Sequence, residues 1–163
     1  MKYFWITLKH KWFVLVAGLR ISVPLYLLVL HDWTKFTPAE LPHYDRQFFG
    51  KADDPLGFSI AWNHHQKNNK HHWEYWVPIS GHTRGGYQDL QPLPMPEKYI
   101  REMVADWFGA ARTYEGHFPL TKGDGIEVDW PWWDKNKEKI RAHCNLQTSI
   151  KINHILLEQG IIP

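Results

Sequence analysis

The spacing of hydrophobic and polar positions predicts helices along most of the chain. Residues 3–19 are apolar on all sides, which is typical of a largely buried helix. Residues 95–114 form the clearest amphipathic segment, and Pro96 stands at its start. The apolar positions of this segment recur at helical spacing: Ile100, Met103, Val104, Trp107 and Phe108. Both segments are therefore expected to contribute to the core.

Further segments also have the features of helices: residues 23–36, 37–50, 58–77, 131–143 and 146–160. Pro24 suits a first helical turn, and Thr37 with Pro38 suits an N-cap followed by the first helical position. Pro42 indicates that the helix after Thr37 is short or irregular, and Gly160 ends the last one.

The segments between these helices are loops, and residues 78–96 form the longest one, rich in Pro and Gly and suited to act as a lid. The sequence holds no internal repeat and no linker long enough to separate domains. The prediction is one all-α domain over residues 1–163, with roughly six helices and one long loop.

The most apolar stretch, residues 12–30, has about the length of a membrane span. Arg20 and Ser22 lie near its middle, where an arginine is costly in hydrocarbon, and Pro24 interrupts it. No cleavage site of small residues follows a clean apolar segment. We therefore expect two buried helices that meet near residues 20–23, and no membrane partner.

The composition narrows the class of function. The net charge is only +2, from 19 basic and 17 acidic residues, so no stable nucleic-acid complex is expected. The single cysteine, Cys144, excludes an internal disulfide and a zinc site made of cysteines, and it is compatible with a reducing cytoplasm, the expected location. Ten tryptophans indicate a core or cleft walled by flat side chains. The anomaly is the content of 11 histidines.

Four of these histidines stand in the stretch WNHHQKNNKHHWEYW, residues 62–76. In a continuous helix, His65 and His72 face the core with the tryptophans, whereas His64 and His71 point nearly the opposite way. Seven residues span about 10.5 Å of helix, which is too far for two ligands of one ion. Either His65 and His72 serve two different ions, or the helix breaks near residues 68–69 and folds the pairs together.

The other candidate ligands are spread along separate helices: His10, His31, Asp32 and Asp106. Taken singly, each has an ordinary structural explanation, such as a core histidine or a helix cap. Together they offer imidazole nitrogen and carboxylate oxygen, which suit divalent Mn, Fe, Co, Ni or Zn. An aspartate next to a histidine is also able to bridge two ions. The remaining histidines are expected on the surface or in loops: His43, His82, His117, His143 and His154.

This order of residues resembles the HD-domain superfamily of metal-dependent phosphohydrolases. The segment HDWTKF, residues 31–36, resembles the His-Asp-x-x-Lys element of that superfamily, and the paired histidines resemble those of members that hold a second metal. Trp33 and Thr34 depart from it, because a small apolar residue and a glycine are usual there. Residues 5–142 are also similar to an uncharacterised family from bacteria and phages.

The resemblance implies an HD-like helical bundle that hydrolyses a nucleotide or other small phosphate ester with two divalent ions. Asp32 bridges the ions in this interpretation, and Lys35 stabilises negative charge as the second catalytic residue. The expected metal ligands are His10, His31, Asp32, His65, His72 and Asp106, with His64 and His71 as alternatives. The expected substrate contacts are Lys35, Asn68, Lys70 and Arg112.

Two other functions remain open at this stage. An HD-type diiron oxygenase uses a similar set of ligands. A non-catalytic nucleotide-binding or interaction protein would need the histidines only for its structure. The apolar N-terminal helices are also compatible with a homodimer.

Overall fold

The computed structural model describes residues 2–50, 54–78, 91–119 and 130–162, and these ranges contain helices and no strand, which confirms the all-α prediction. The α-helices are α1 (Lys2–Arg20), α2 (Leu25–Leu30), α3 (Leu41–Phe49), α4 (Pro55–Asn68), α5 (Glu97–Tyr114), α6 (Pro131–His143) and α7 (Leu146–Glu158). Two short 3-10 helices, η1 (Trp33–Phe36) and η2 (Trp73–Trp76), lie between them.

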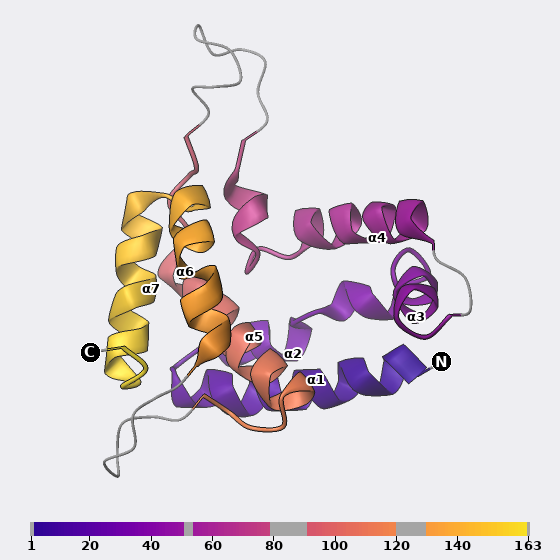
Figure 1. Cartoon of the computed structure of the whole chain (residues 1–163), viewed down its shortest axis with the longest axis horizontal. Helices are drawn as coiled ribbons and strands as arrows, with labels where there is room; N and C mark the ends of the chain where they lie inside the picture. Colours follow the sequence, from indigo (N-terminus) through magenta and orange to yellow (C-terminus); the bar gives the residue numbers. More distant parts are fainter. Residues whose placement is uncertain (1, 51–53, 79–90, 120–129, 163) are drawn as a thin grey trace, which may run out of the picture.

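Helices α1 and α5 form the central pair of the fold. A Cβ atom added to Gly109 of α5 would lie 2.5 Å from Val14 Cγ2 of α1, so the absent side chain lets the two helices approach closely. The N-terminal half of α1 lies beside α3, which in turn contacts α4, and the other end of α1 lies towards α6 and α7 (Figure 1).

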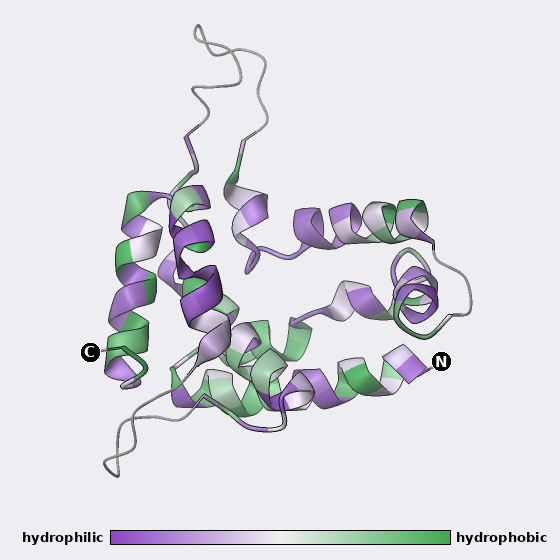
Figure 2. Cartoon of the chain, viewed as in Figure 1, coloured by the Kyte–Doolittle hydropathy of each residue, from purple (hydrophilic) through white to green (hydrophobic). Residues whose placement is uncertain are grey.

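The buried apolar residues form two clusters. The larger cluster joins α1, α2, α5, α6 and α7, and the smaller one consists of Tyr3, Leu41, Tyr44 and Ala61. Apolar residues gather where α1, α2 and α5 meet, whereas much of α6 is hydrophilic (Figure 2). His10 lies on the buried face of α1 between Tyr3 of the smaller cluster and Val14 of the larger one.

Three predicted helices differ from the structure. The helix expected over residues 23–36 ends at Leu30 and resumes as η1 at Trp33. The next helix begins at Leu41, so the predicted N-cap at Thr37 is wrong. The helix expected over residues 58–77 begins earlier, at Pro55, and ends at Asn68.

The capping residue explains the earlier start of α4. The Asp54 side chain accepts a hydrogen bond of 3.0 Å from the Gly57 amide, and Pro55 occupies the first helical position. Most of the predicted loop over residues 78–96 lies outside the described residues. Among the described helices, none combines the length and the apolar content that crossing a membrane requires.

Candidate metal centre

The break between α2 and η1 carries the central residues of the site. Asp32 has a φ angle of 54°, in the left-handed region, where most residues with a side chain are strained. His31 and Asp32 are both buried, with exposed fractions of 1% and 0%. A strained backbone that turns two polar side chains into the interior is typical of a functional site.

The first group of donors joins three parts of the chain: His10 from α1, His31 and Asp32 from the break, and Asp106 from α5. The Nε2 atoms of His10 and His31 lie 2.8 and 3.3 Å from Asp106 Oδ1. The same two nitrogens lie 3.7 and 3.6 Å from Asp32 Oδ2. One donor atom from each residue lies within 4.8 Å of all the others, a spacing that fits one metal ion.

The second group lies on the other side of the same aspartate and contains Asp32, His65, His71 and His72. Asp32 Oδ1 lies 3.2 Å from His65 Nε2 and 3.5 Å from His71 Nε2. His65 belongs to the last turn of α4, and the other two histidines follow the end of that helix. The two carboxylate oxygens of Asp32 therefore face two different groups of donors.

Several donor atoms of these groups are buried without a hydrogen-bond partner. They are the Nε2 atoms of His31, His65, His71 and His72, together with Asp32 Oδ1. A buried polar atom that makes no hydrogen bond costs about 1 to 3 kcal/mol. An arrangement with so many of them in one place is expensive for a protein without a metal. The residues present therefore fit divalent ions.

Two buried glutamates contact the Nδ1 atoms of the imidazoles, on the side of each ring that faces away from the centre. Glu102 Oε1 lies 3.2 Å from His31 Nδ1 and 3.3 Å from His71 Nδ1, and thus contacts both groups. Glu40 Oε2 lies 2.9 Å from His65 Nδ1. Because a carboxylate only accepts, these Nδ1 atoms donate, so that each imidazole, when it is neutral, directs the lone pair of its Nε2 at the centre.

Opposite charges within the centre shift the pKa values of its residues. Burial by itself raises the pKa of Asp32, but the charges of His31 and Lys35 hold it well below its ordinary value. Burial by itself lowers the pKa of His31, but the Asp32 charge and the contacts with the carboxylates of Asp106 and Glu102 raise it to about 10. Without a metal, His31 is therefore a cation near neutral pH that compensates the buried carboxylates.

Two histidines of the second group, His71 and His72, behave differently, whereas the Asp32 charge and hydrogen bonds to Asp32 and Glu40 outweigh burial and raise the pKa of His65. Burial and the neighbouring His31 lower the pKa of His71, and burial and the neighbouring His71 lower that of His72 well below its ordinary value. Both imidazoles are therefore neutral near pH 7, the form that binds metal.

The structure brings together all six residues predicted as ligands. The alternative His71 joins them with an exposed fraction of only 2%. His64 does not, because its half-exposed ring contacts the outer side of Glu40 at 2.7 Å. The helix breaks after Asn68, so the interpretation with a continuous helix is wrong and the one with a break is confirmed.

The predicted substrate contacts are dispersed, apart from Lys35, whose Nζ lies 2.6 Å from Asp32 Oδ2. Asn68 is exposed and donates to the His64 carbonyl oxygen. Lys70 is exposed near the rings of Tyr75 and Tyr99, and Arg112 packs over the ring of Phe13 at 5.2 Å.

The other histidines stand apart from the centre. His117, His143 and His154 are exposed, as predicted, and His43 is partly buried beside Asp54 at 3.4 Å. His82 lies outside the described residues.

Sequence reasoning missed four residues that support the ligands: Thr34, Glu40, Asn69 and Glu102. Glu102 carried a usable signal, because it precedes Asp106 by four positions and so lies on the same face of α5. Glu40 had no such signal, because the sequence predicts a helix that starts after Thr37 and contains Glu40, whereas in the structure α3 begins only at Leu41.

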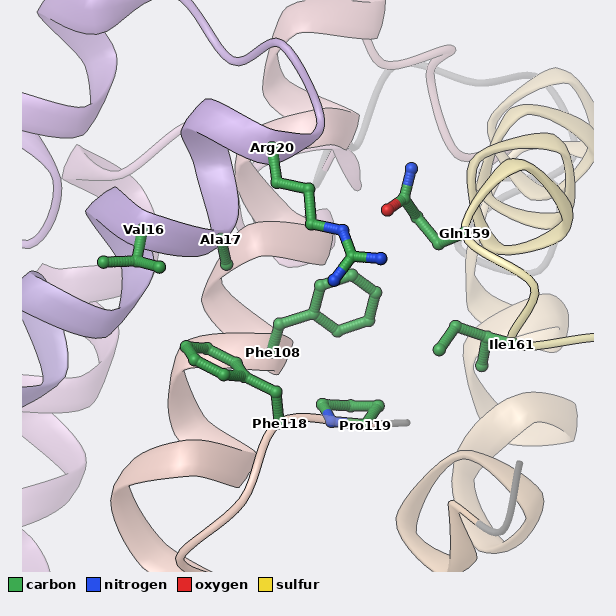
Figure 3. A pocket seen from close by; sticks show the side chains of 8 residues that line it. All are labelled: Val16, Ala17, Arg20, Phe108, Phe118, Pro119, Gln159 and Ile161. Atoms are coloured by element: carbon green, nitrogen blue, oxygen red, sulfur yellow. The ribbon is translucent and has the colours of Figure 1, made fainter. Parts of the chain in front are cut away.

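Two cavities among the described residues lie outside this centre. The one in Figure 3 measures about 70 Å³ and is lined by residues from α1, α5 and the C-terminal segment, among them Arg20 and Phe108, and by no candidate ligand. A larger recess of about 520 Å³ is lined by Tyr3, Ile6, Phe48, Phe49 and Tyr114.

This aromatic recess lies close to the centre through a chain of contacts. The Tyr3 ring stacks on that of Tyr44 with 5.0 Å between centroids. Lys35 Nζ lies 5.9 Å from the centroid of the same Tyr44 ring. The wall of the recess is therefore separated from the lysine of the centre by one aromatic side chain.

The fold and the site define an all-helical protein with a buried histidine and carboxylate centre suited to metal ions. The chain belongs to a family of unknown function (DUF5662), which matches residues 1–158. No curated protein and no solved structure matches the chain.

Proposed function

We propose that the protein is a metal-dependent phosphohydrolase that acts on a nucleotide or another small phosphate ester with two divalent transition-metal ions. The observation that carries this proposal is the position of Asp32, whose two carboxylate oxygens face two separate groups of donors. A shared carboxylate between two sets of ligands is the arrangement of a two-metal hydrolytic centre.

The residues divide between the two ions without further rearrangement of the chain. His10, His31 and Asp106 would hold the first ion, and His65, His71 and His72 would hold the second, with Asp32 available to both. Ions of this kind lower the pKa of water, so that hydroxide is available near neutral pH, and they neutralise the charge of a phosphate.

The charge of the centre supports an anionic substrate. The carboxylates of Asp32, Asp106, Glu40 and Glu102 and the ammonium of Lys35 leave three negative charges when the histidines are neutral. Two divalent ions change this to one positive charge. A net positive centre attracts a phosphate ester and stabilises the charge that develops during its hydrolysis.

Lys35 is one of the residues through which the centre reaches solvent. Its side chain is 15% exposed and its Nζ contacts Asp32 Oδ2. Burial by itself lowers the pKa of Lys35, but the charges of Asp32 and Asp106 and the hydrogen bond to Asp32 together raise it well above the ordinary value. Lys35 therefore remains a cation and is placed to bind a phosphate oxygen next to the bridging carboxylate.

The aromatic recess gives this substrate a place for its non-reacting part. A volume of about 520 Å³ is in the range of small-molecule sites, and its lining of aromatic side chains suits a flat group. This feature favours a nucleotide or an aryl phosphate over a small aliphatic ester.

One observation favours a second function. The second group offers three imidazoles and a single carboxylate, a ligand set that also suits iron. A diiron oxygenase is therefore the alternative, and iron content with visible absorption that responds to dioxygen would favour it.

Metal content tests the proposal first. Elemental analysis of the purified protein should find near-stoichiometric transition metal, and Asp32→Asn, which keeps the shape of the buried side chain, should lose most of it. Asp134→Asn is the matched control, because Asp134 is exposed and pairs with the partly exposed Lys137. The metal-loaded protein should then hydrolyse nucleoside monophosphates or 4-nitrophenyl phosphate. Absence of metal in both proteins, even after incubation with excess Mn²⁺ or Zn²⁺, would refute a metal-dependent enzyme.

A further inference from the structure

The two N-terminal helices, which the sequence predicts to be buried and to have no membrane partner, expose an unusual number of large apolar side chains on their outer side. On α1 they are Trp5, Leu8, Trp12, Val16 and Leu19, and on α2 and the following turn they are Leu25, Tyr26, Val29, Leu30 and Trp33. Several are more than half exposed, including Trp5 at 69% and Trp12 at 61%. We call these ten residues the N-terminal apolar face.

The residues on α1 form a continuous stripe. Their spacing of three and four positions places them on one side of the helix, opposite the buried face that carries His10 and Val14. Helix α2 lies beside this stripe, because Lys11 Nζ of α1 donates to the Val29 carbonyl oxygen at 3.1 Å and also to that of His31. The apolar residues of both helices therefore belong to neighbouring parts of the surface.

The charges around this face have one sign. Residues 1–31 contain four basic residues, Lys2, Lys9, Lys11 and Arg20, and no aspartate or glutamate. Three of the four are exposed on α1, along one edge of the stripe.

Neighbouring elements do not cancel this positive charge. Lys98 of α5 adds to it, with its Nζ 3.1 Å from the Tyr26 hydroxyl. The nearby acidic Glu97 is paired with Arg101 at 2.8 Å, and the single negative charge of Asp45, which accepts a hydrogen bond from the Tyr3 amide, is matched in number by Lys98.

We propose that the N-terminal apolar face binds the surface of an anionic phospholipid bilayer. A helix with tryptophan and leucine on one face and lysine or arginine beside them is suited to lie in the plane of a membrane interface. Anionic lipids complement the basic edge, and each basic residue near the surface contributes to the attraction.

Charge favours a bilayer over a second copy of the chain. Antiparallel pairing of two α1 stripes about a two-fold axis places the basic edges on the same side, and residues 1–31 offer no acidic partner for them. The buried face of α1 remains packed on α5 during lipid binding, so the helix docks without leaving the fold. This inference is independent of the proposed function.

Sedimentation with lipid vesicles tests the inference. The full-length protein should bind vesicles of phosphatidylcholine mixed with phosphatidylglycerol and bind much less to phosphatidylcholine alone. Binding should weaken as salt is added, and tryptophan emission should shift to shorter wavelength. The double variant Lys2→Gln/Lys9→Gln should bind about 25-fold more weakly, since each surface charge contributes about fivefold. The double variant Trp5→Ser/Trp12→Ser should also lose binding and the spectral shift.

Matched variants outside the face provide the control. Lys135→Gln/Lys139→Gln removes the same charge from exposed positions of α6, and Leu146→Ser removes an apolar side chain that is 71% exposed on α7. These variants should bind vesicles like the wild type, and circular dichroism should show that every variant is folded.

Two results would overturn the inference. One is absent vesicle binding, or binding that does not depend on anionic lipid. The other is a stable dimer in light-scattering measurements that dissociates on Trp5→Ser/Trp12→Ser and fails to bind vesicles, because the occupant of the face would then be a second copy.

Discussion

Replacement of Glu102 by glutamine should weaken the binding of both metal ions, whereas replacement of Glu40 should weaken only one. Glu102 Oε1 contacts His31 of the first group and His71 of the second, at 3.2 and 3.3 Å. Among the ligands, Glu40 contacts only His65. A neutral amide in place of a carboxylate polarises the imidazole less and makes it a poorer ligand.

The size of the effect follows from the number of ligands that each carboxylate holds. Loss of one partner behind a metal-bound histidine reduces affinity by about 10-fold to 100-fold, or roughly 1.4 to 2.8 kcal/mol. Glu102→Gln should therefore lose this amount at each of the two binding steps. Glu40→Gln should lose it at one step and leave the other unchanged.

Isothermal titration calorimetry of the chelator-stripped protein with Mn²⁺ or Zn²⁺ measures the two steps separately. Glu97→Gln is the matched control, because Glu97 lies on the same helix but is half exposed and pairs with Arg101. Melting temperatures of the metal-free variants separate a loss of affinity from a loss of folded protein. Unchanged affinity in Glu102→Gln, or equal loss at both steps in Glu40→Gln, would refute the reasoning.

Three further predictions concern other parts of the molecule. Metal binding at pH 7 should release at least one proton per protein, because the pKa of His31 is about 10 without metal and a metal ligand must be unprotonated. Titrations in buffers of different ionisation enthalpy will show this release. The affinity for metal should accordingly rise with pH up to about that pKa. Gly109→Ala should destabilise the protein by about 1 to 3 kcal/mol, measured by urea unfolding, since the new Cβ would lie 2.8 Å from the Val14 backbone nitrogen. Cys144 should react with iodoacetamide at pH 8 about a thousandfold more slowly in the native than in the unfolded protein, because burial raises its pKa from 9.0 to about 12; similar rates would contradict this.

The helices were largely predictable because hydrophobic spacing reports directly on the buried face of a helix. The segment Glu97–Tyr114 differs from the predicted residues 95–114 only at its start, and Pro131–His143 agrees at both ends. The break at Asp32 was not predictable in this way. It depends on a left-handed backbone at a residue other than glycine, and the apolar run before it gives no sign of that conformation.

The candidate ligands were predictable for a different reason, which is the chemistry of the residue types and their order along the chain. The same information did not reveal the two glutamates that contact the Nδ1 atoms of these histidines. A lone glutamate in a sequence is most often a solvated surface residue, and only the fold shows that Glu40 and Glu102 are buried, with exposed fractions of 0% and 4%.

The turn after α4 explains why both histidines of the pair 71–72 face the centre. In a continuous helix, adjacent residues diverge by about 100°, and at most one of them faces a given ligand. Asn69 ends the helix instead, because its side-chain amide donates to the His65 carbonyl oxygen and to Thr34 Oγ1, both at 2.8 Å. The chain then turns back, and the rings of His71 and His72 lie 4.4 Å apart beside that of His65. The distance of about 10.5 Å that separates such residues along a helix no longer applies, and three imidazoles reach one side of Asp32. One asparagine that ends a helix thus turns a repeated histidine pair into a candidate second metal site.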